Sequence, residues 1–594
     1  MKRFIRVTSH PITKKFVLCV VSLAIGIVYV SVQAVQSRGS NPLVNALGVP
    51  LPPDAAPLQE QELVQFIEER PYMEWFYTVY KSSQAMHLVA EPLMRVDHNF
   101  DLIPAAAQRW EVSDDGLRWT FYLQPGLRFS DGAPLTARDY VYTLRRGANP
   151  DNAYDLEWYY RSIKNWSDVV GRRKPVEAIG VRAIDDLTLE FTTDAPVPYF
   201  PYLINYTWVS PRRAIEKYGD SWSSRSETSI ASGPFRIKEW LKSDHMTLEL
   251  NPMYRGPSRP YLQRILYKLY IVAAQPQFLP AYESGEVDVI NVDNQAQVAR
   301  LANDPALKDQ LNSYVEFQTY YLTMDTYNSL FKDIRLRKAF GHAIDREALC
   351  RSALKHFAEP AYAMLPPGFP GESETQLSGA QNYDPELARG YLAEAGYPGG
   401  KGFPPVDMWI RNEGDIQRTA AEAIQAMLKR NLGIDIGVRN MEIKVFMDAL
   451  NQHRIPLAMV PYEYDYLDPS NLLGIWLSNG RHAWRNDRFE QLMVKGSAFL
   501  GSYDDRMEVY REAERILVEE AGAVFLWHRR INQIWRPYLV SPALVPNRYG
   551  QRFWRSDKLQ NVATTLYIRK NDLTPDRHRP PMMERLWTWL QQRS

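Results

Sequence analysis

Cysteine is almost absent from this chain of 594 residues, which has only Cys19 and Cys350. Cys19 lies in an apolar stretch near the N-terminus, so the remainder holds one thiol and cannot form an internal disulfide. The ten histidines are scattered, without the spacing HExxH or another spacing that binds a metal ion. We therefore expect no metal and no cofactor, and a fold stabilised by its size and packing.

Recognisable catalytic and phosphate-binding motifs are also missing. The segment Gly396–Gly402 has the wrong spacing for a phosphate-binding loop, and no Ser or Thr follows Lys401. No Gly-x-Ser-x-Gly motif marks a hydrolase nucleophile. Paired acids for glycoside hydrolysis are defined by their separation in space, and no motif supports such a pair. The sequence therefore predicts no catalytic residue and no enzyme.

An excess of one charge is lacking as well. Lys and Arg number 70 and Asp and Glu number 69, which gives a formal net charge of +1. A nucleic-acid-binding protein would show a basic excess, so we expect no nucleic-acid partner. Aromatic residues are abundant, with 16 Trp and 35 Tyr. Most of them belong in the cores of two or three domains, but such rings also suit a groove that binds an extended ligand.

The N-terminus carries a membrane-targeting pattern. Basic residues precede an uncharged stretch over residues 16–35, and a helix of that length spans ~30 Å, enough to cross a bilayer with its basic flank in the cytoplasm. A cleaved signal peptide usually has a shorter apolar region, yet Val32-Gln33-Ala34 offers a small-residue cleavage site. Two interpretations stay open, an anchor in the inner membrane and a signal peptide within residues 1–36. Either one exports the rest of the chain to the periplasm or cell envelope.

The segment Ala107–Arg145 predicts a β-hairpin followed by a helix. Apolar and polar residues alternate over residues 117–123, as in a half-buried strand, and the Asp-Asp-Gly sequence before them supplies a tight turn. Thr136 stands three residues before Asp139, which is the spacing of a capping box at a helix start. These are features of a scaffold, without a nucleophile or a metal-ligand pattern.

Several phrases of this segment, in the same order, resemble the extracellular solute-binding proteins of family 5, the oligopeptide- and dipeptide-binding receptors of ABC importers. They are Trp110–Gly116 (WEVSDDG), Leu123–Gly132 (LQPGLRFSDG) and Pro134–Asp139 (PLTARD). The resemblance continues over about residues 70–570. The further matching phrases are Glu91–Asp97, Ser232–Phe235, Asn251–Tyr254, Tyr282–Asp288 and Asp333–Arg346.

This resemblance implies an α/β fold with two lobes, of the periplasmic-binding-protein type (type II, with an extra inserted lobe). A two-segment hinge would join the lobes near Thr319–Asp325 and Val524–Trp527. The implied parts are a linker (37–62), a first lobe (63–97, 230–324 and 526–571), an inserted lobe (98–229), a second α/β lobe (325–525) and a tail (572–594). The tail has Trp and Arg at near-helical spacing and would rest on its own protein, a membrane surface or a partner.

The second lobe alternates between predicted helices and strands, which indicates an α/β sheet. Helices are expected over 420–432 and 443–452, and strands over 434–438 and 455–460. Ligands bind beyond the carboxyl ends of strands in such sheets, and here the loop Pro461–Pro469 follows the last strand. This loop is therefore the predicted ligand-binding segment.

Four residues of that loop are the candidate site. The resemblance implies that Asp465 pairs with the α-ammonium of a bound peptide, while a turn or a helix cap is the alternative role. Tyr462, Glu463 and Tyr464 are candidate pocket residues, and Asp468 is the expected helix cap. Family members often have Gly at the position of Pro461, whose ring removes a backbone donor, and the acidic Glu463 is a second departure that would favour a cationic ligand.

The function implied is that of the substrate-binding component of an ABC importer. It would capture an oligopeptide between its lobes and deliver it to a permease with ATPase subunits, without a chemical step. Three alternatives stay open: the same receptor fold with an oligosaccharide or another solute, a secreted carbohydrate-active enzyme, and an anchored sensor or chaperone-like protein.

Overall fold

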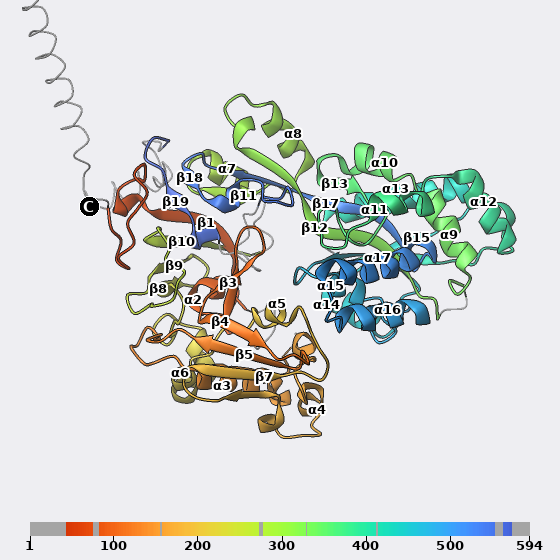
Figure 1. The fold of residues 1–594 in the computed structure, drawn as a ribbon. Helices are drawn as coiled ribbons and strands as arrows, with labels where there is room; N and C mark the ends of the chain where they lie inside the picture. Colours follow the sequence, from red (N-terminus) through yellow and green to blue (C-terminus); the bar gives the residue numbers. More distant parts are fainter. Residues whose placement is uncertain are drawn as a thin grey trace, which may run out of the picture.

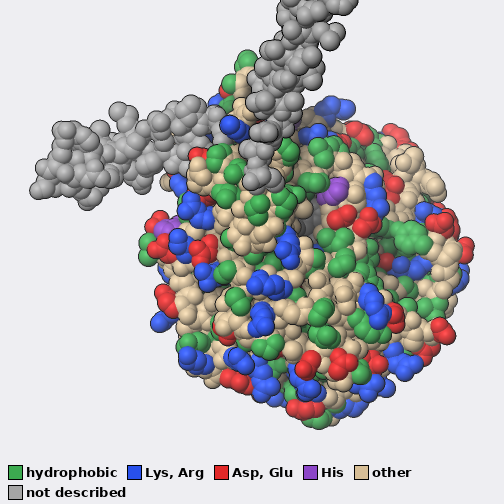
Figure 2. All heavy atoms as spheres, turned by 60° about the vertical axis from the view of Figure 1, so that its left-hand side comes forward, with side chains coloured by type: hydrophobic (Ala, Val, Ile, Leu, Met, Phe, Trp, Pro, Cys, Tyr) green, Lys and Arg blue, Asp and Glu red, His purple; other side chains and the backbone are tan. Residues whose placement is uncertain are grey.

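A computed structural model describes residues 43–74, 82–154, 157–271, 277–327, 330–411, 414–552 and 562–572. Helices and strands alternate along much of this chain, and the elements gather into two main bodies joined by two long strands (Figure 1). The predicted mixed α/β, two-lobed architecture is confirmed. Basic and acidic side chains are interspersed over the face shown in Figure 2, in keeping with the balanced composition.

One sheet of eleven strands runs through both bodies. Its order is β15-β14-β16-β12-β17-β11-β1-β10-β9-β8, and β13 pairs with β17. The long strands β12 and β17 lie at its centre and are antiparallel. The bounds are β1 Glu62–Glu68, β8 Phe235–Leu241, β9 His245–Leu250, β10 Arg264–Tyr270, β11 Val289–Asn291, β12 Leu311–Met324, β13 Ala358–Pro360, β14 Asp407–Arg411, β15 Gly437–Met441, β16 Leu457–Glu463 and β17 Ala523–Trp535.

The strands β12 and β17 connect the two bodies. On the first-lobe side β17 pairs with β11, and on the second-lobe side β12 pairs with β16 from Gln318 onward. Between these two ends the β12–β17 ladder shifts its register, between Val315 and Thr319. A register shift bends and twists a strand pair locally. The crossings expected near Thr319–Asp325 and Val524–Trp527 fall on these two strands, while the lobe boundaries themselves stay a prediction.

A separate four-stranded sheet, in the order β4-β5-β7-β6, forms the core of the lobe between residues 98 and 229. The predicted alternation is confirmed in β5, where Trp119, Phe121 and Leu123 are buried. Strand β4 lies at the sheet edge, and its Val112 is 48% exposed. The capping box of Thr136 and Asp139 is present at the start of α3. The bounds are β4 Ala107–Val112, β5 Arg118–Leu123, β6 Val181–Ala183, β7 Thr188–Thr192, α3 Ala137–Ala148, α4 Trp166–Val170, α5 Phe200–Ile204 and α6 Arg212–Tyr218.

Several of the family-like phrases meet at one buried node around Glu91. The Arg95 Nη2 atom lies 3.0 Å from Glu91 Oε2, and the Tyr254 hydroxyl donates to Glu91 Oε1 at 2.9 Å. The Glu91 backbone N–H donates to Ser232 Oγ at 2.9 Å. Burial raises the pKa of Glu91, and the Arg95 charge opposes that shift. At Gly233 an added Cβ would lie 2.4 Å from the Leu88 carbonyl oxygen, so the phrase Ser232–Phe235 has glycine for steric reasons.

The second lobe packs helices on its part of the sheet. Its bounds are α9 Ile334–Ala343, α10 Arg346–Ala348, α11 Glu374–Leu377, α12 Pro385–Glu394, α13 Asp415–Leu432, α14 Ile443–Asn451, α15 Pro469–Gly474, α16 Asp487–Ser497 and α17 Tyr503–Glu519. Asp333 and Asp384 cap α9 and α12 as expected. Two buried arginines in the phrase Asp333–Arg346, Arg337 and Arg346, donate to several backbone carbonyls, so their role is structural.

Three predicted boundaries in this lobe were wrong. The helix predicted over 420–432 begins earlier, at Asp415, and the strand predicted over 434–438 is β15 at 437–441. Ile434 and Ile436 are buried in the connecting segment before this strand. The strand predicted to end at Val460 continues as β16 to Glu463. Pro461 therefore lies within a strand, where a loop was expected.

Residues 43–62 of the predicted linker lie within the described part of the chain. The Asn45 side chain donates to the Pro260 carbonyl at 2.6 Å, and buried Gln61 donates to the carbonyls of Ala56 and Ile568 at 2.9 Å. These hydrogen bonds tie the segment to the first lobe. The remaining described elements are α2 Met86–Val89, α7 Phe278–Glu283, α8 Gln295–Asn303, β2 Met94–Val96, β3 Leu102–Pro104, β18 Leu539–Val540 and β19 Tyr567–Ile568.

The predicted apolar segment 16–35 and nearly all of the tail 572–594 lie outside the described residues. Within the described ranges, no helix combines the length and the apolar character needed to cross a membrane. The same ranges contain no group of three or more His, Cys, Asp or Glu side chains placed to hold a metal ion.

Candidate functional site

The backbone of β16 determines which residues face the edge of the sheet. The Tyr464 N–H donates to the Phe317 carbonyl at 3.1 Å, so residue 464 faces β12. Because backbone groups alternate in direction along a strand, Pro461 and Glu463 face the opposite edge. Strand β14 meets β16 at Ala458, before Pro461. A proline without an N–H is tolerated there, because no ladder bond to β12 is lost.

Asp465 lies between β16 and α15 as a half-buried residue with neutral hydrogen-bond partners. The Tyr462 hydroxyl donates to Asp465 Oδ2 at 3.0 Å, and the Asn471 side-chain amide donates to the same oxygen at 3.3 Å. The Asp465 backbone N–H donates to Asn471 Oδ1 at 2.7 Å. Among the described residues no Lys, Arg or His forms an ion pair with this carboxylate. The carboxylate can therefore still accept a cationic partner.

Asp468 caps α15, as predicted, through a 3.0 Å hydrogen bond from the Ser470 N–H. Its carboxylate also forms a buried ion pair with Arg506 of α17: the Nη2 and Oδ2 atoms are 2.7 Å apart, and the side chains are 7% and 5% exposed. Burial raises the pKa of Asp468, and the Arg506 charge opposes that shift. This pair anchors the C-terminal end of the loop and holds Asp465 in place.

Tyrosines of the inserted lobe contact the loop of the second lobe. The hydroxyls of Tyr206 and Tyr159 donate to the Asp465 carbonyl at 3.1 and 3.4 Å. The rings of Tyr199 and Tyr466 stack with their centroids 5.4 Å apart and an interplanar angle of 5°. The loop is thus held by both lobes at once. No local motif marks these tyrosines; their only signal in the sequence is the high Trp and Tyr content of residues 155–222.

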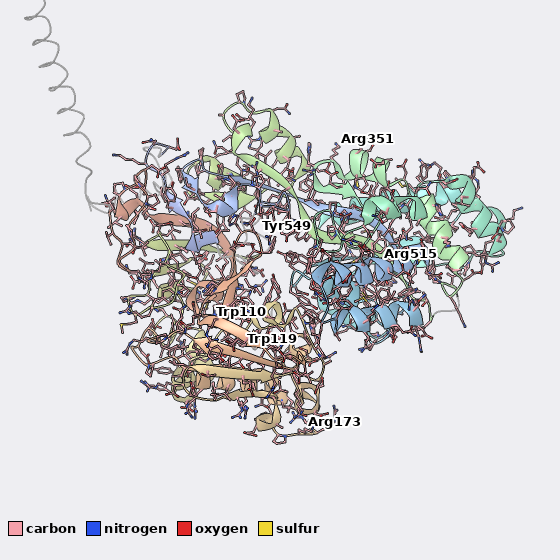
Figure 3. The ribbon with its side chains drawn as sticks, in the orientation of Figure 1. Trp110, Trp119, Arg173, Arg351, Arg515 and Tyr549 are labelled. Carbon is pink, nitrogen blue, oxygen red and sulfur yellow. The ribbon has the colours of Figure 1, made fainter. Side chains whose placement is uncertain are left out.

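Tyr464 belongs to an aromatic cluster in which all three lobes meet. The centroid of its ring lies 5.8 Å from that of Phe100 in the inserted lobe, 5.5 Å from that of Phe317 in β12 and 6.2 Å from that of Phe369 in the second lobe. Tyr549 joins the cluster through Phe100 at 5.9 Å and lies near the junction of the lobes in Figure 3. Tyr464 is therefore a packed residue of the lobe interface, and Trp110 and Trp119 lie farther away, on the inserted lobe (Figure 3).

Positive charge also lies close to the candidate carboxylate. The guanidinium of Arg481 is 5.2 Å from the centroid of the Tyr462 ring, and the Tyr462 hydroxyl contacts Asp465. Burial raises the pKa of Tyr462 well above its usual value, and the Asp465 charge adds to that shift. Beside it, burial lowers the pKa of His482 well below its usual value, so this imidazole is neutral. The site thus presents the Asp465 carboxylate, which has no ion-pair partner in the described part of the chain, with Arg481 on the other side of the Tyr462 ring.

The sequence of the chain matches a model of the family described as bacterial extracellular solute-binding proteins, family 5 Middle, over residues 101–484. That match covers more than half of the chain. The chain belongs to this family. The resemblance drawn from the phrases around Trp110 is confirmed. The matched residues include Asp465 and three members of the aromatic cluster, Phe317, Phe369 and Tyr464.

Related sequences and solved structures also resemble this chain over most of its length. A periplasmic oligopeptide-binding protein of Salmonella typhimurium is 29% identical over 79% of this chain and 85% of its own length. A probable deoxycholate-binding periplasmic protein of Escherichia coli is 28% identical over 76% and 84%. The structure of a periplasmic oligopeptide-binding protein from Borrelia burgdorferi, 25% identical, matches with a TM-score of 0.69 over 84% of this chain and 99% of that one. The Escherichia coli murein tripeptide binding protein has the same fold, with a TM-score of 0.69 and 23% identity.

Proposed function

We propose that this chain is the exported substrate-binding component of an ABC importer and that it captures an oligopeptide between its lobes. The observation that carries the proposal is the half-buried carboxylate of Asp465, which lies where two lobes meet and has only neutral partners. A charge left unpaired in a closed site is costly, and the α-ammonium of a peptide would pair with it. The ligand then passes to a permease with ATPase subunits, and no chemical step is needed.

The mechanism follows from differential binding to two arrangements of the lobes. The inserted lobe holds the carbonyl of Asp465 through Tyr206, while the side chain of the same residue is available to the ligand. A ligand that contacts both lobes binds the closed arrangement more tightly and shifts the equilibrium towards it. Glu463, on the outward edge of β16, would contribute a second negative charge, whereas Pro461 offers a carbonyl without an N–H. Peptide backbone contacts along this edge are therefore fewer than a full strand would make.

Calorimetry with matched ligands tests the proposal. Tri- to pentapeptides should bind, and N-acetylation of the same peptides should weaken binding by about tenfold or more, because a charge-assisted hydrogen bond is lost. In Asp465→Asn, which keeps the shape of the side chain, the free and acetylated peptides should bind almost equally. Failure of every peptide, or an unchanged acetylation effect in Asp465→Asn, would reject the assignment.

A receptor for another solute is the second candidate, because one relative is named for deoxycholate and because aromatic rings surround the site. Oligosaccharides and a bile acid therefore belong in the same calorimetric panel. Binding of one of these without any peptide would favour that candidate. A glycan panel assayed for released products tests the remaining alternative of a carbohydrate-active enzyme, and N-terminal sequencing of the exported protein tests whether the first residues are cleaved.

A further inference from the structure

A polar cavity of about 560 Å³ lies at the hinge, between the two main lobes. Its wall includes the first residues of β12, from Leu311 to Val315, and the loop from Pro546 to Arg552. Pro367 closes it from the second lobe. We call it the hinge cavity. Because its wall combines both lobes with a strand that joins them, anything bound there contacts both sides of the hinge.

The charged side chains that line the hinge cavity are two arginines, without an acid among its lining residues. Arg530 forms an ion pair with Glu359, so its charge is compensated. Arg552 has a neutral partner: its Nη1 atom donates to Asn312 Oδ1 at 2.5 Å. No carboxylate of the described residues pairs with Arg552. The hinge cavity therefore carries one uncompensated positive charge on a half-buried wall.

A second polar group of the wall has unused hydrogen-bonding capacity. Gln551 is only 3% exposed, and its side-chain oxygen has no hydrogen-bond partner among the described residues. Its backbone, by contrast, is fixed, because the Gln551 N–H donates to Asn547 Oδ1 at 2.9 Å and its carbonyl accepts from the Asn547 N–H at 2.7 Å. Buried polar groups in folded proteins almost always have a partner. The Gln551 oxygen is an acceptor and suits a donor group of a ligand, whereas the neighbouring Arg552 is the group of this wall that suits an anion.

We propose that the hinge cavity binds a carboxylate group through Arg552. A planar guanidinium matches a carboxylate with two parallel hydrogen bonds, and the cavity is large enough for a short peptide end or a small organic acid. Two sources share this chemistry: the C-terminal carboxylate of the captured peptide, which rests on the proposed function, and a free carboxylate anion that would bind independently of it. Either one would lie between Arg552 of the first lobe and Pro367 of the second, so it would favour the arrangement in which these two residues approach each other.

The test uses the full exported chain, freed of co-purified ligand. Tri-, tetra- and pentalanine are titrated by calorimetry with a free and with an amidated C-terminus, and citrate is titrated alone. The variants are Arg552→Gln, which removes the charge but keeps a polar side chain, and Arg552→Lys, which restores the charge. Arg548→Gln is the matched control, because Arg548 lies in the same loop, is exposed and pairs with Asp101 outside the cavity.

If the hinge cavity binds the C-terminal end of the peptide, amidation should weaken peptide binding by about tenfold or more in the wild type and in Arg548→Gln. In Arg552→Gln, amidation should weaken peptide binding by less than about twofold. If the hinge cavity binds a free anion instead, amidation of the peptide should have no effect. Citrate should then bind, Arg552→Gln should weaken citrate binding by about tenfold, and Arg552→Lys should partly restore it. If amidation has no effect and citrate binding is absent or unchanged in Arg552→Gln, the proposal is overturned. If no peptide binds at all, the proposed function fails, while the citrate titration still shows whether the hinge cavity binds a carboxylate through Arg552.

Discussion

Replacing Glu514 with glutamine should remove one pH dependence from the stability of this protein. Glu514 lies on α17, is fully buried and has no cationic partner among the described residues. Its Oε1 atom accepts from the Leu365 N–H at 2.7 Å, and its Oε2 atom accepts from Ser373 Oγ at 3.0 Å. Burial raises the pKa of Glu514 to about 8, and the charge of nearby Glu374 adds to the shift.

The sign of the effect follows from which state holds the proton. The pKa of Glu514 is higher in the folded than in the unfolded protein, so the folded state retains a proton that the unfolded state releases above about pH 4.5. Its contribution to stability is complete below that pH and is lost as the pH rises through about 8. Between these values the free energy of unfolding falls by ~1.4 kcal/mol per pH unit, which amounts to about 3–5 kcal/mol in total.

Urea unfolding at pH 5, 6, 7, 8 and 9 measures this contribution. Glu514→Gln stays neutral and keeps an acceptor for the Leu365 N–H, so its stability relative to the wild type should rise by ~1.4 kcal/mol per pH unit between pH 5 and 8. Glu508→Gln is the control, because Glu508 lies on the same helix and is exposed. If the stability curves of the wild type and Glu514→Gln run parallel over this range, the side chain is ionised in the folded protein and the reasoning is refuted.

Two further substitutions test the packing of the scaffold and the contact between the lobes. Gly233→Ala should destabilise the fold by about 1–3 kcal/mol or more, because the added carbon meets a backbone carbonyl, whereas Gly390→Ala, on an open helix face, should be neutral or slightly stabilising in the same thermal-shift assay. Tyr206→Phe removes the shorter of the two hydroxyl contacts with the Asp465 carbonyl, so small-angle scattering should show a larger radius of gyration without ligand. Tyr202→Phe, which loses a bond within the inserted lobe only, should leave the radius unchanged.

Local patterns in the sequence were sufficient for the fold class and for several helix starts. The pair Thr136 and Asp139 forms its capping box, and Asp468 caps α15, because both features depend on residues a few positions apart. The family-like phrases converge on Glu91, whose partners Arg95 and Tyr254 satisfy its buried carboxylate. Such phrases identify the family because a buried node tolerates few substitutions, and for the same reason they say little about the ligand.

Contacts between distant segments could not be predicted in the same way. Pro461 suggested the end of a strand, but the open edge of β16 accommodates it, and that edge is a property of the whole sheet. The contacts of Tyr159 and Tyr206 with Asp465 join residues 306 and 259 positions apart, beyond any local pattern. The roles given to Asp465, Tyr462, Glu463 and Tyr464 as ligand contacts stay predictions until a ligand is measured.

The hydrogen-bonded ladder between β12 and β17 also determines how the protein unfolds. Each of these strands contributes one half to the first lobe and the other half to the second, so neither lobe can be excised as a self-contained piece without cutting a hydrogen-bonded strand. Cooperative units of unfolding follow such contiguous structure. The two lobes should therefore melt as one unit, and a protease that nicks one lobe should expose the other.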